Sequence, residues 1–282
     1  IDAANSIGFL CALGILGMLA CLGEIRRLWL RGALLAGGAV ALYGVVLSAS
    51  RGAFLTLIAT VVLWSFLCLI GSARFKLTAV IGAVLLLILS YWVYQFIVHE
   101  TYMGTRYTKA LGMEDGSTQE RANLFVIGLH VIGANPLFGC GLGQFNVVSG
   151  TGLYAHNDLM EVLVATGVPG FLLYYSVYWM AWRRLTWSLR YLGDPQLRYR
   201  INAARVALLI LLISGSTSRP IFISQDTMFI LGIVVGMAHW AERLARGARR
   251  DFSGMPVSMP AHERNVFSSN PANRREYFPV SS

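Results

Sequence analysis

Long apolar runs dominate this sequence, and they constrain its fold more than any other feature. The clearest run, residues 77–98 (LTAVIGAVLLLILSYWVYQFIV), is long enough to cross a bilayer and places Trp92 and Tyr94 at an interfacial position. Charged residues make up only 13% of the chain, whereas a soluble domain carries about 25%. The sequence therefore predicts a polytopic membrane protein.

The apolar runs divide the chain into about seven predicted spans, which together form an all-α transmembrane bundle. They lie near residues 7–23, 32–48, 52–71, 77–98, 168–182, 203–218 and 223–241. We expect residues 1–246 to form the membrane domain. Residues 247–282 are rich in Ser, Pro, Asn and Arg without periodicity, which predicts a disordered cytoplasmic tail. Because Ile1 leads directly into a span without a signal peptide, we expect the chain to be the C-terminal part of a longer protein.

The distribution of charge predicts the orientation of the spans. Every second connection is basic, and those connections together carry +12, whereas the other set carries −3, which accounts for the net charge of +9. Basic loops remain on the cytoplasmic side, so the long loop over residues 99–167 is predicted to be external. The positive charge of the chain is thus a topology signal, and no nucleic-acid partner is expected.

Cysteine and histidine spacing predicts neither a disulfide framework nor a metal site. Three cysteines lie in apolar runs, Cys140 is alone in the outer loop, and the histidines form no i, i+4 pair. We therefore expect no metal and no cofactor.

The segment Ser48-Ala-Ser-Arg51-Gly52 forms a tight turn between two predicted spans. Arg51 lies beside the N-terminus of the next helix, where a cation opposes the helix dipole unless an anion compensates it. This favours an anion-binding role for Arg51. The alternative is an arginine that extends to the lipid phosphates.

A second polar segment opens a predicted helix that runs from Ser117 to about Ala134 and ends at Asn135-Pro136. Ser117 and Glu120 match a capping box, and the apolar face suits a helix lying at the outer interface. Arg121 falls in the first turn, near free backbone N–H groups, and this arrangement suits a phosphate. A pair with Glu120 or contact with solvent is the alternative.

The glycines of Gly139-Cys-Gly141-Leu-Gly143 loosely resemble a dinucleotide fingerprint, but no βαβ unit surrounds them. We predict a tight loop that brings its backbone close to another segment.

His156 lies where the chain re-enters the membrane, before an apolar helix broken at Gly167-Val-Pro-Gly170. Asn157 or Asp158 is available as the N-cap of this helix. A histidine can accept a proton from a hydroxyl near neutral pH, so His156 is a candidate general base. The alternative is a hydrogen-bonded interfacial histidine without catalytic function.

Taken in order, three segments resemble the O-antigen ligase and polymerase-related family of bacterial membrane proteins. They are SASRGAFLTL at 48–57, ERANLFVIGLHVIGANPLFGCGLGQF at 120–145 and AHNDLMEVLVATGVPG at 155–170. The resemblance covers about residues 40–182. It implies a GT-C-like membrane glycosyltransferase that needs neither metal nor nucleotide sugar.

The resemblance also implies a location and partners. The donor would be a glycan on undecaprenyl diphosphate at the periplasmic face of the inner membrane, and the acceptor lipid A–core or another glycan or protein. Arg51 and Arg121 would hold the diphosphate, and His156 would activate the acceptor hydroxyl. Asn157 is a supporting candidate, and Arg219 is an outward cation for the donor path unless it is simply solvated.

Family members often carry a glutamate shortly before the glycine of the re-entry helix, whereas this chain reads Ala165-Thr-Gly167. Glu161, one turn earlier, is the candidate substitute. A polymerase, or a ligase that glycosylates protein, would use the same motifs. A transporter of the lipid-linked glycan would need the arginines but no base, and a membrane scaffold would need neither.

Overall fold

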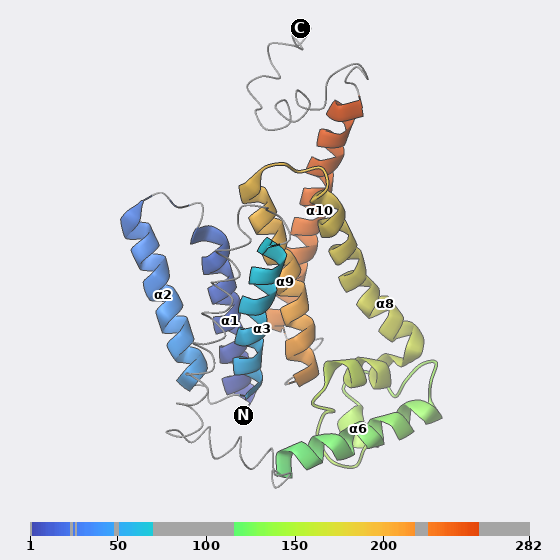
Figure 1. The fold of residues 1–282 in the computed structure, drawn as a ribbon. Coiled ribbons are helices and arrows are strands. Elements are labelled where there is room, and N and C mark those ends of the chain that lie inside the picture. Colours follow the sequence, from blue (N-terminus) through green and yellow to red (C-terminus); the bar gives the residue numbers. More distant parts are fainter. Residues whose placement is uncertain are drawn as a thin grey trace, which may run out of the picture.

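The computed structural model describes residues 2–22, 25, 27–47, 51–69, 116–217 and 225–253, and all secondary structure within these ranges is helical (Figure 1). The helices are α1 Asp2–Leu22, α2 Leu28–Leu47, α3 Arg51–Leu69, α6 Gly116–Ala134, α7 Phe145–Val148, α8 Asp158–Ser188, α9 Pro195–Thr217 and α10 Gln225–Ser253. Six of the predicted spans fall on these helices. The predicted span 77–98 and Arg219 lie outside the described residues. The disordered tail is predicted to begin at residue 247, but α10 continues to Ser253. The rest of the predicted tail lies outside the described residues.

Three of the described helices are long and apolar enough to cross a membrane. These stretches are Leu28–Val45, Asp158–Ser188 and Thr227–Arg249. Shorter apolar helices cover Ile7–Leu22 and Gly52–Leu67. The all-helical character of the described chain agrees with the predicted class, while seven crossings stay a prediction.

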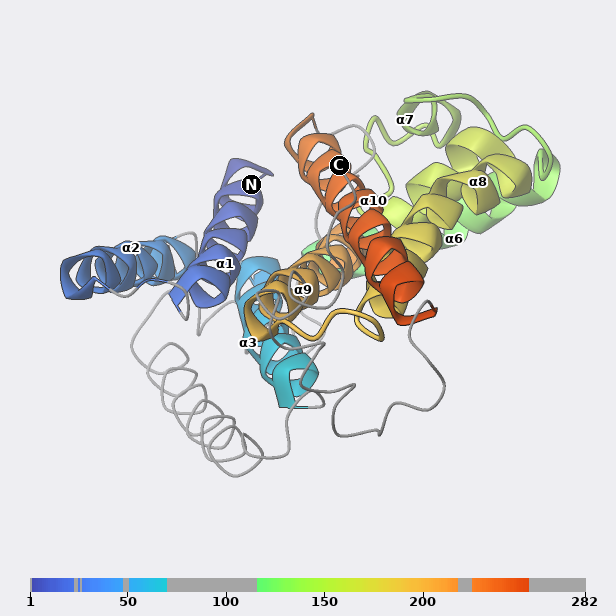
Figure 2. The same ribbon diagram turned by 90° about the horizontal axis from the view of Figure 1, so that it is seen from above.

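Helix α9 lies in the middle of the bundle, between α3 and α10 (Figure 2). The face of α10 that packs inward follows a heptad-like stripe of Leu231, Val234, Ala238, Ala241 and Ala245. The three alanines have no exposed surface. Small residues at such a contact let helix backbones approach closely. In a membrane, this close packing drives helix association, because lipid is as apolar as the helices and there is no hydrophobic driving force between them.

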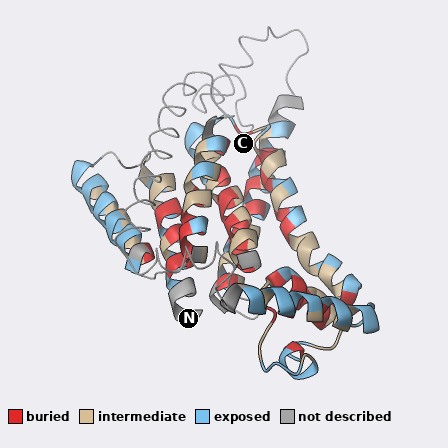
Figure 3. Cartoon of the chain, turned by 60° about the horizontal axis from the view of Figure 1, so that its bottom comes forward, coloured by how far each residue is buried: buried red, intermediate tan, exposed pale blue. Residues whose placement is uncertain are grey.

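Helix α2 lies at the edge of the bundle, packs along α1 and makes only a small contact with α3. Val45 packs with Ile15 of α1 and Phe54 of α3, whereas most of α2 is exposed (Figure 3). Trp29 and Val40, for example, keep 66% and 71% of their surface. An apolar helix with so much of its side-chain surface exposed is expected to face lipid.

The ends of the described helices lie at two opposite ends of the bundle (Figure 1). The α6 end, at the bottom of Figure 1, holds the N-terminus of α3, α6, α7 and the start of α8. The arginine end, at the top, holds the α8–α9 connection and the C-terminal turns of α8 and α10, with Arg183, Arg184, Arg190, Arg246 and Arg249. The connections predicted to be external and those predicted to be cytoplasmic are therefore separated in space.

Candidate functional site

Helix α6 lies across one end of the bundle, and its extent agrees with the prediction, since it ends at Ala134 before Asn135-Pro136 (Figure 1). The side chains of Ser117 and Thr118 are outside the description, so the capping box stays a prediction. One face of α6 packs on the start of α8, where Leu124 is buried with Met160 and Val164. A Cβ at Gly128 would come within 2.6 Å of the Met160 sulfur, so glycine there allows the close approach.

Helix α8 is interrupted at Gly167, as the sequence predicts. Gly167 has φ 69° and ψ −176°, a region that is essentially restricted to glycine, and Pro169 follows near the start of the second segment. The interruption separates a short first segment, residues 158–166, from a long second segment, residues 168–188. Residues 158–166 lie beside α6, and residues 168–188 run to the arginine end (Figure 1).

The glycine-containing loop after α6 closes this interruption. The N–H groups of Cys140 and Gly141 donate to the carbonyls of Val164 and Ala165, at 2.8 and 3.0 Å. The Val168 N–H in turn donates to the Pro136 carbonyl at 2.8 Å. Backbone groups freed by a break in a membrane helix must find such partners within the protein.

The loop and the break in α8 approach each other closely at Gly139, which has a φ of 67°. A Cβ there would lie 2.7 Å from the carbonyl carbon of Ala165, and a Cβ at Gly167 would lie 2.8 Å from the Phe138 nitrogen. The prediction that the glycine loop brings its backbone close to another segment is confirmed, and that segment is the break in α8.

A partly buried hydrogen bond joins the two segments of α8. The Tyr175 hydroxyl donates to Asp158 Oδ2 at 3.0 Å across 17 residues, so the second segment folds back over the first. Asp158 is only 3% exposed. The sequence interpretation considered Asp158 only as a cap and did not identify Tyr175. A carboxylate at the start of an apolar helix, followed by the tyrosine cluster at 174, 175 and 178, was the available signal.

His156 immediately precedes this helix and has an unusual backbone conformation. Its φ of 51° is the only positive value at a non-glycine residue within the described ranges. A histidine in the left-handed region carries strain that persists only when its surroundings impose it, and such residues concentrate at functional sites.

Three contacts around His156 impose this conformation. Asn157, one of the two predicted candidates, is the N-cap of α8, and its side chain accepts from the Met160 N–H at 3.3 Å. The rings of Tyr154 and His156 stack with their centroids 4.1 Å apart. Glu161 Oε2 accepts from the Ala155 N–H at 2.8 Å. The histidine is thus held from both sides along the chain.

Glu161, the candidate acidic residue, is 1% exposed and acts on the backbone beside His156. Its carboxylate orders the loop that precedes α8, and this contact makes it a positioning residue. The neighbouring carboxylate, Asp158, is held separately by Tyr175.

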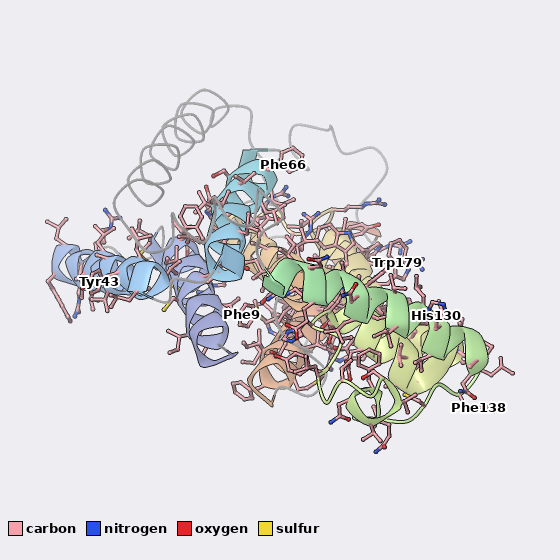
Figure 4. All side chains as sticks on the ribbon, turned by 90° about the horizontal axis from the view of Figure 1, so that it is seen from below. Phe9, Tyr43, Phe66, His130, Phe138 and Trp179 are labelled. Carbon is pink, nitrogen blue, oxygen red and sulfur yellow. The ribbon has the colours of Figure 1, made fainter. Side chains whose placement is uncertain are left out.

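The predicted phosphate-binding arginines lie at the same end of the bundle as His156. Arg121 is half-buried one turn before Leu124, which packs with Ala155 next to His156. Arg51 is the first residue of α3, whose N-terminus is at the α6 end, but its side chain is outside the description. Figure 4, viewed from this end, shows α6 crossing over the bundle with Phe138 at its rim. The structure therefore places Arg121 and His156 at the α6–α8 junction.

A cavity of about 500 Å³ lies between α6 and the loop that leads to His156. Its polar lining comes from Gln119, Glu120, Asn123 and Thr151. A larger cavity, about 1100 Å³, lies at the arginine end between α8 and α10. We place the candidate site at the smaller cavity, because it lies at the α6–α8 junction with Arg121 and His156, whereas the larger one lies at the opposite end of the bundle.

Within the described ranges, no three side chains of His, Cys, Asp or Glu gather closely enough to hold a metal ion. Cys140 is a free thiol in the glycine loop, and burial raises its pKa, which disfavours the reactive thiolate. Whether the reaction is metal-independent stays a prediction.

The helical architecture and the interrupted helix with its strained histidine define a membrane protein with a polar site at one end of its bundle. Residues 36–175 match the family model of O-antigen ligases, and this region belongs to that family. The match contains Arg51, Arg121 and His156 and ends at Tyr175, so it leaves out Arg219 and the arginine end. No curated protein is significantly similar to the chain. The match indicates a bacterial membrane protein with a function of the O-antigen ligase or polymerase type.

Proposed function

We propose that this chain is a membrane glycosyltransferase of the O-antigen ligase type. It transfers a glycan from undecaprenyl diphosphate to an acceptor hydroxyl, on lipid A–core or a similar molecule, at the periplasmic face of the inner membrane. The observation that carries the proposal is the strained His156, held at the α6–α8 junction inside the region that belongs to the family.

In the proposed reaction, the acceptor oxygen attacks the anomeric carbon from the side opposite the diphosphate. The bond between the anomeric carbon and the phosphate oxygen breaks, and undecaprenyl diphosphate leaves with the bonding electron pair. His156 accepts the proton of the acceptor hydroxyl as the new bond forms. The configuration at the anomeric carbon is therefore inverted. General-base catalysis of this kind contributes about 10²–10⁴ in rate.

The arginines act on the leaving group, which gains negative charge as the bond breaks. Fixed guanidinium groups in a site shielded from water stabilise such charge and bind phosphate in a bidentate manner. Arg51 adds its charge to the positive end of the α3 dipole. Arg121 lies in the second turn of α6, because the helix begins at Gly116 and not at Ser117 as predicted. The role of Arg219 on the donor path belongs to the same proposal.

The cavity beside α6 supports a place for the sugar next to His156. Gln119, Asn123 and Thr151 supply amide and hydroxyl groups that can hydrogen-bond sugar hydroxyls, while Leu124, Ile127 and Leu153 provide apolar surface. Glu161 and Asn157 then serve to keep the histidine aligned with the bound sugar.

The role of His156 is tested with two substitutions measured in membranes supplied with lipid-linked glycan. Asparagine tolerates a positive φ, so His156→Asn removes the base while retaining the backbone conformation, whereas His156→Ala removes both. We expect His156→Asn to reduce transfer by about 10²–10⁴ with donor binding intact. Transfer at the unsubstituted rate in this variant would exclude His156 as the base.

Arg51 and Arg121 are tested by donor affinity. Arg51→Gln and Arg121→Gln are expected to weaken donor binding by about 2–5 kcal/mol each if the charge pair is desolvated. Arg243→Gln, an exposed arginine on α10, is the matched control and should leave the affinity unchanged. Equal affinities in all three variants would favour arginines that merely contact lipid phosphates.

The periplasmic location is tested by labelling single cysteines in intact cells, after the native cysteines are replaced. Asn146→Cys lies in the exposed part of α7, and Gln196→Cys lies in the α8–α9 connection region at the arginine end. A membrane-impermeant reagent should reach position 146 in intact cells and position 196 only after lysis. The reverse result would invert the proposed topology.

The acceptor is identified by deleting the gene and comparing surface glycans. Loss of long chains from lipopolysaccharide with accumulation of lipid-linked polymer is expected for a ligase. Accumulation of single lipid-linked repeat units would instead indicate a polymerase with the same chemistry.

A further inference from the structure

The cavity of about 1100 Å³ at the arginine end has no part in the proposed transfer reaction. It lies between the last turns of α8, residues 179–190, and those of α10, residues 242–249. All of its lining residues lie outside the region 36–175 that belongs to the O-antigen ligase family. We call it the α8–α10 groove.

The α8–α10 groove has an excess of positive charge. Its lining contains one glutamate, Glu242, and five arginines, which leaves four net positive charges. The arginines are Arg183, Arg184, Arg190, Arg246 and Arg249.

Glu242 is already shared between two of these arginines. Its carboxylate lies 3.3 Å from Arg184 Nε and 2.6 Å from Arg246 Nη2. Arg183 and Arg190 are exposed and form no ion pair with a carboxylate among the described residues. Arg249 lies over the Tyr191 ring at 5.9 Å. The groove therefore offers the guanidinium groups of Arg183 and Arg190, which have neither an ion pair nor a ring contact of this kind within the described ranges, to an anion from outside the chain.

The other side of the groove is aromatic. Trp179, Trp182 and Trp187 line it, and Trp179 keeps 66% of its surface exposed. Arg205 of α9 stacks on Trp182 at 4.3 Å, which adds a further cation behind the ring. Tryptophan beside arginine is the composition of the boundary between hydrocarbon and headgroups.

The lengths of the two helices place the groove at that boundary. Helix α10 has 29 residues, so at about 1.5 Å per residue it extends beyond a hydrocarbon core that is about 30 Å thick. The second segment of α8, residues 168–188, is about as long as that core is thick and runs to the same end of the bundle. Their terminal turns, which carry the arginines, then lie at headgroup level, while Trp179 and Met180 lie one or more turns deeper.

We propose that the α8–α10 groove binds an anionic phospholipid. The lipid phosphate pairs with Arg183 and Arg190, and an acyl chain packs against Trp179 and Met180. An anion with an apolar chain matches both sides of the groove, whereas a free phosphate would match only one. Basic pockets between membrane helices bind acidic headgroups on the cytoplasmic side in this way. The bound lipid would bridge the last turns of α8 and α10.

The test uses the purified full chain in nanodiscs and the quenching of tryptophan fluorescence by lipids with brominated acyl chains. Phosphatidylglycerol is compared with phosphatidylcholine, which carries no net charge. We expect phosphatidylglycerol to quench at about tenfold lower mole fraction or less, because two arginines face its phosphate. Equal quenching by both lipids would overturn the proposal.

The variant Arg183→Gln/Arg190→Gln should weaken phosphatidylglycerol binding by about 25-fold, at about fivefold per arginine. The matched control Arg27→Gln/Arg243→Gln removes two exposed charges at the same end, outside the groove, and should change binding less than about twofold. The pair Arg183→Lys/Arg190→Lys retains the charges and should restore most of the affinity, which separates lost charge from lost folding.

Two further results would overturn the lipid assignment. An equal loss in the control variant would mean that a diffuse basic surface, and not the groove, attracts the lipid. Full displacement of phosphatidylglycerol by millimolar inorganic phosphate would mean that the groove is a site for free anions. Resistance to inorganic phosphate, together with sensitivity to the acyl chain length, is the expected outcome.

Discussion

The two ends of the bundle use charged residues in opposite ways. At the α6 end, Asp158 and Glu161 are 3% and 1% exposed, and each accepts a hydrogen bond from a specific donor. At the arginine end, Arg184 and Arg246 keep 43% and 66% of their side chains exposed and share Glu242, which keeps 16%. Helix α8 contributes residues to both ends.

The difference shows which charges determine topology and which shape a site. Exposed arginines act through their number, so their exact neighbours matter little for orientation. A buried carboxylate acts through its position, because burial without a donor is costly. The family match covers the buried carboxylates and stops before the arginine end, which agrees with this distinction.

The largest loss of stability is expected from substitutions at the contact between the glycine loop and the break in α8. Gly139→Ala and Gly167→Ala each add a Cβ that meets opposing backbone, at a positive φ that residues with a side chain rarely adopt. We expect a loss of about 3 kcal/mol or more in the free energy of unfolding, measured by thermal unfolding in detergent micelles.

Gly143→Ala is the matched control, because Gly143 has a similar φ of 69° but an added Cβ would meet nothing within 4 Å. Its cost should be limited to the backbone conformation, about 1 kcal/mol. An equal loss in all three variants would mean that the close approach of the two segments contributes nothing.

The next effect concerns Glu161. Glu161→Ala leaves the Ala155 N–H without its acceptor, which should cost about 1–3 kcal/mol of stability and reduce transfer, because His156 loses its support. Glu161→Gln retains an acceptor oxygen and should cost less than the alanine variant in both measurements. If the glutamine variant lost as much activity as the alanine variant, the charge of Glu161 would be the important property.

Tyr175→Phe tests the hydrogen bond that joins the two segments of α8. Removing this donor to a buried carboxylate should destabilise the protein by about 1–2 kcal/mol in the same unfolding measurement. Tyr43→Phe, at a position that is 63% exposed on α2, is the control and should have no effect. If Tyr175→Phe left the free energy of unfolding unchanged, the hydrogen bond to Asp158 would not stabilise the site.

The smallest effect is expected at the arginine end. Glu242→Gln removes both of its ion pairs, yet such pairs at the surface contribute about 1 kcal/mol or less and are screened by salt. Unfolding midpoints at low and high salt should therefore differ little between the variant and the unsubstituted protein. A loss above 2 kcal/mol would show that charge is as specific at this end as at the α6 end.

Local features of the sequence predict much of this protein. The apolar runs fall on α1, α2, α3, α8, α9 and α10, because a helix that satisfies its own backbone can form wherever an apolar run is long enough. The end of α6 at Asn135-Pro136 and the break at Gly167 follow from the backbone preferences of proline and glycine at those positions. Asn157 as the N-cap of α8 is a local property of the same kind.

Only the tertiary structure decides which distant groups meet. The sequence places Glu161 one turn from a missing glutamate, but it does not predict the hydrogen bond of Glu161 to Ala155. The tyrosine cluster after Asp158 is visible in the sequence, but which tyrosine reaches Asp158 is not. The α8–α10 groove likewise depends on two helices that are more than 50 residues apart along the chain. Each of these contacts depends on the angle at the break in α8 and on how the helices pack, and neither is encoded in a single segment. Periodicity and turn residues report on the backbone within a few residues, whereas the site is formed by contacts between segments.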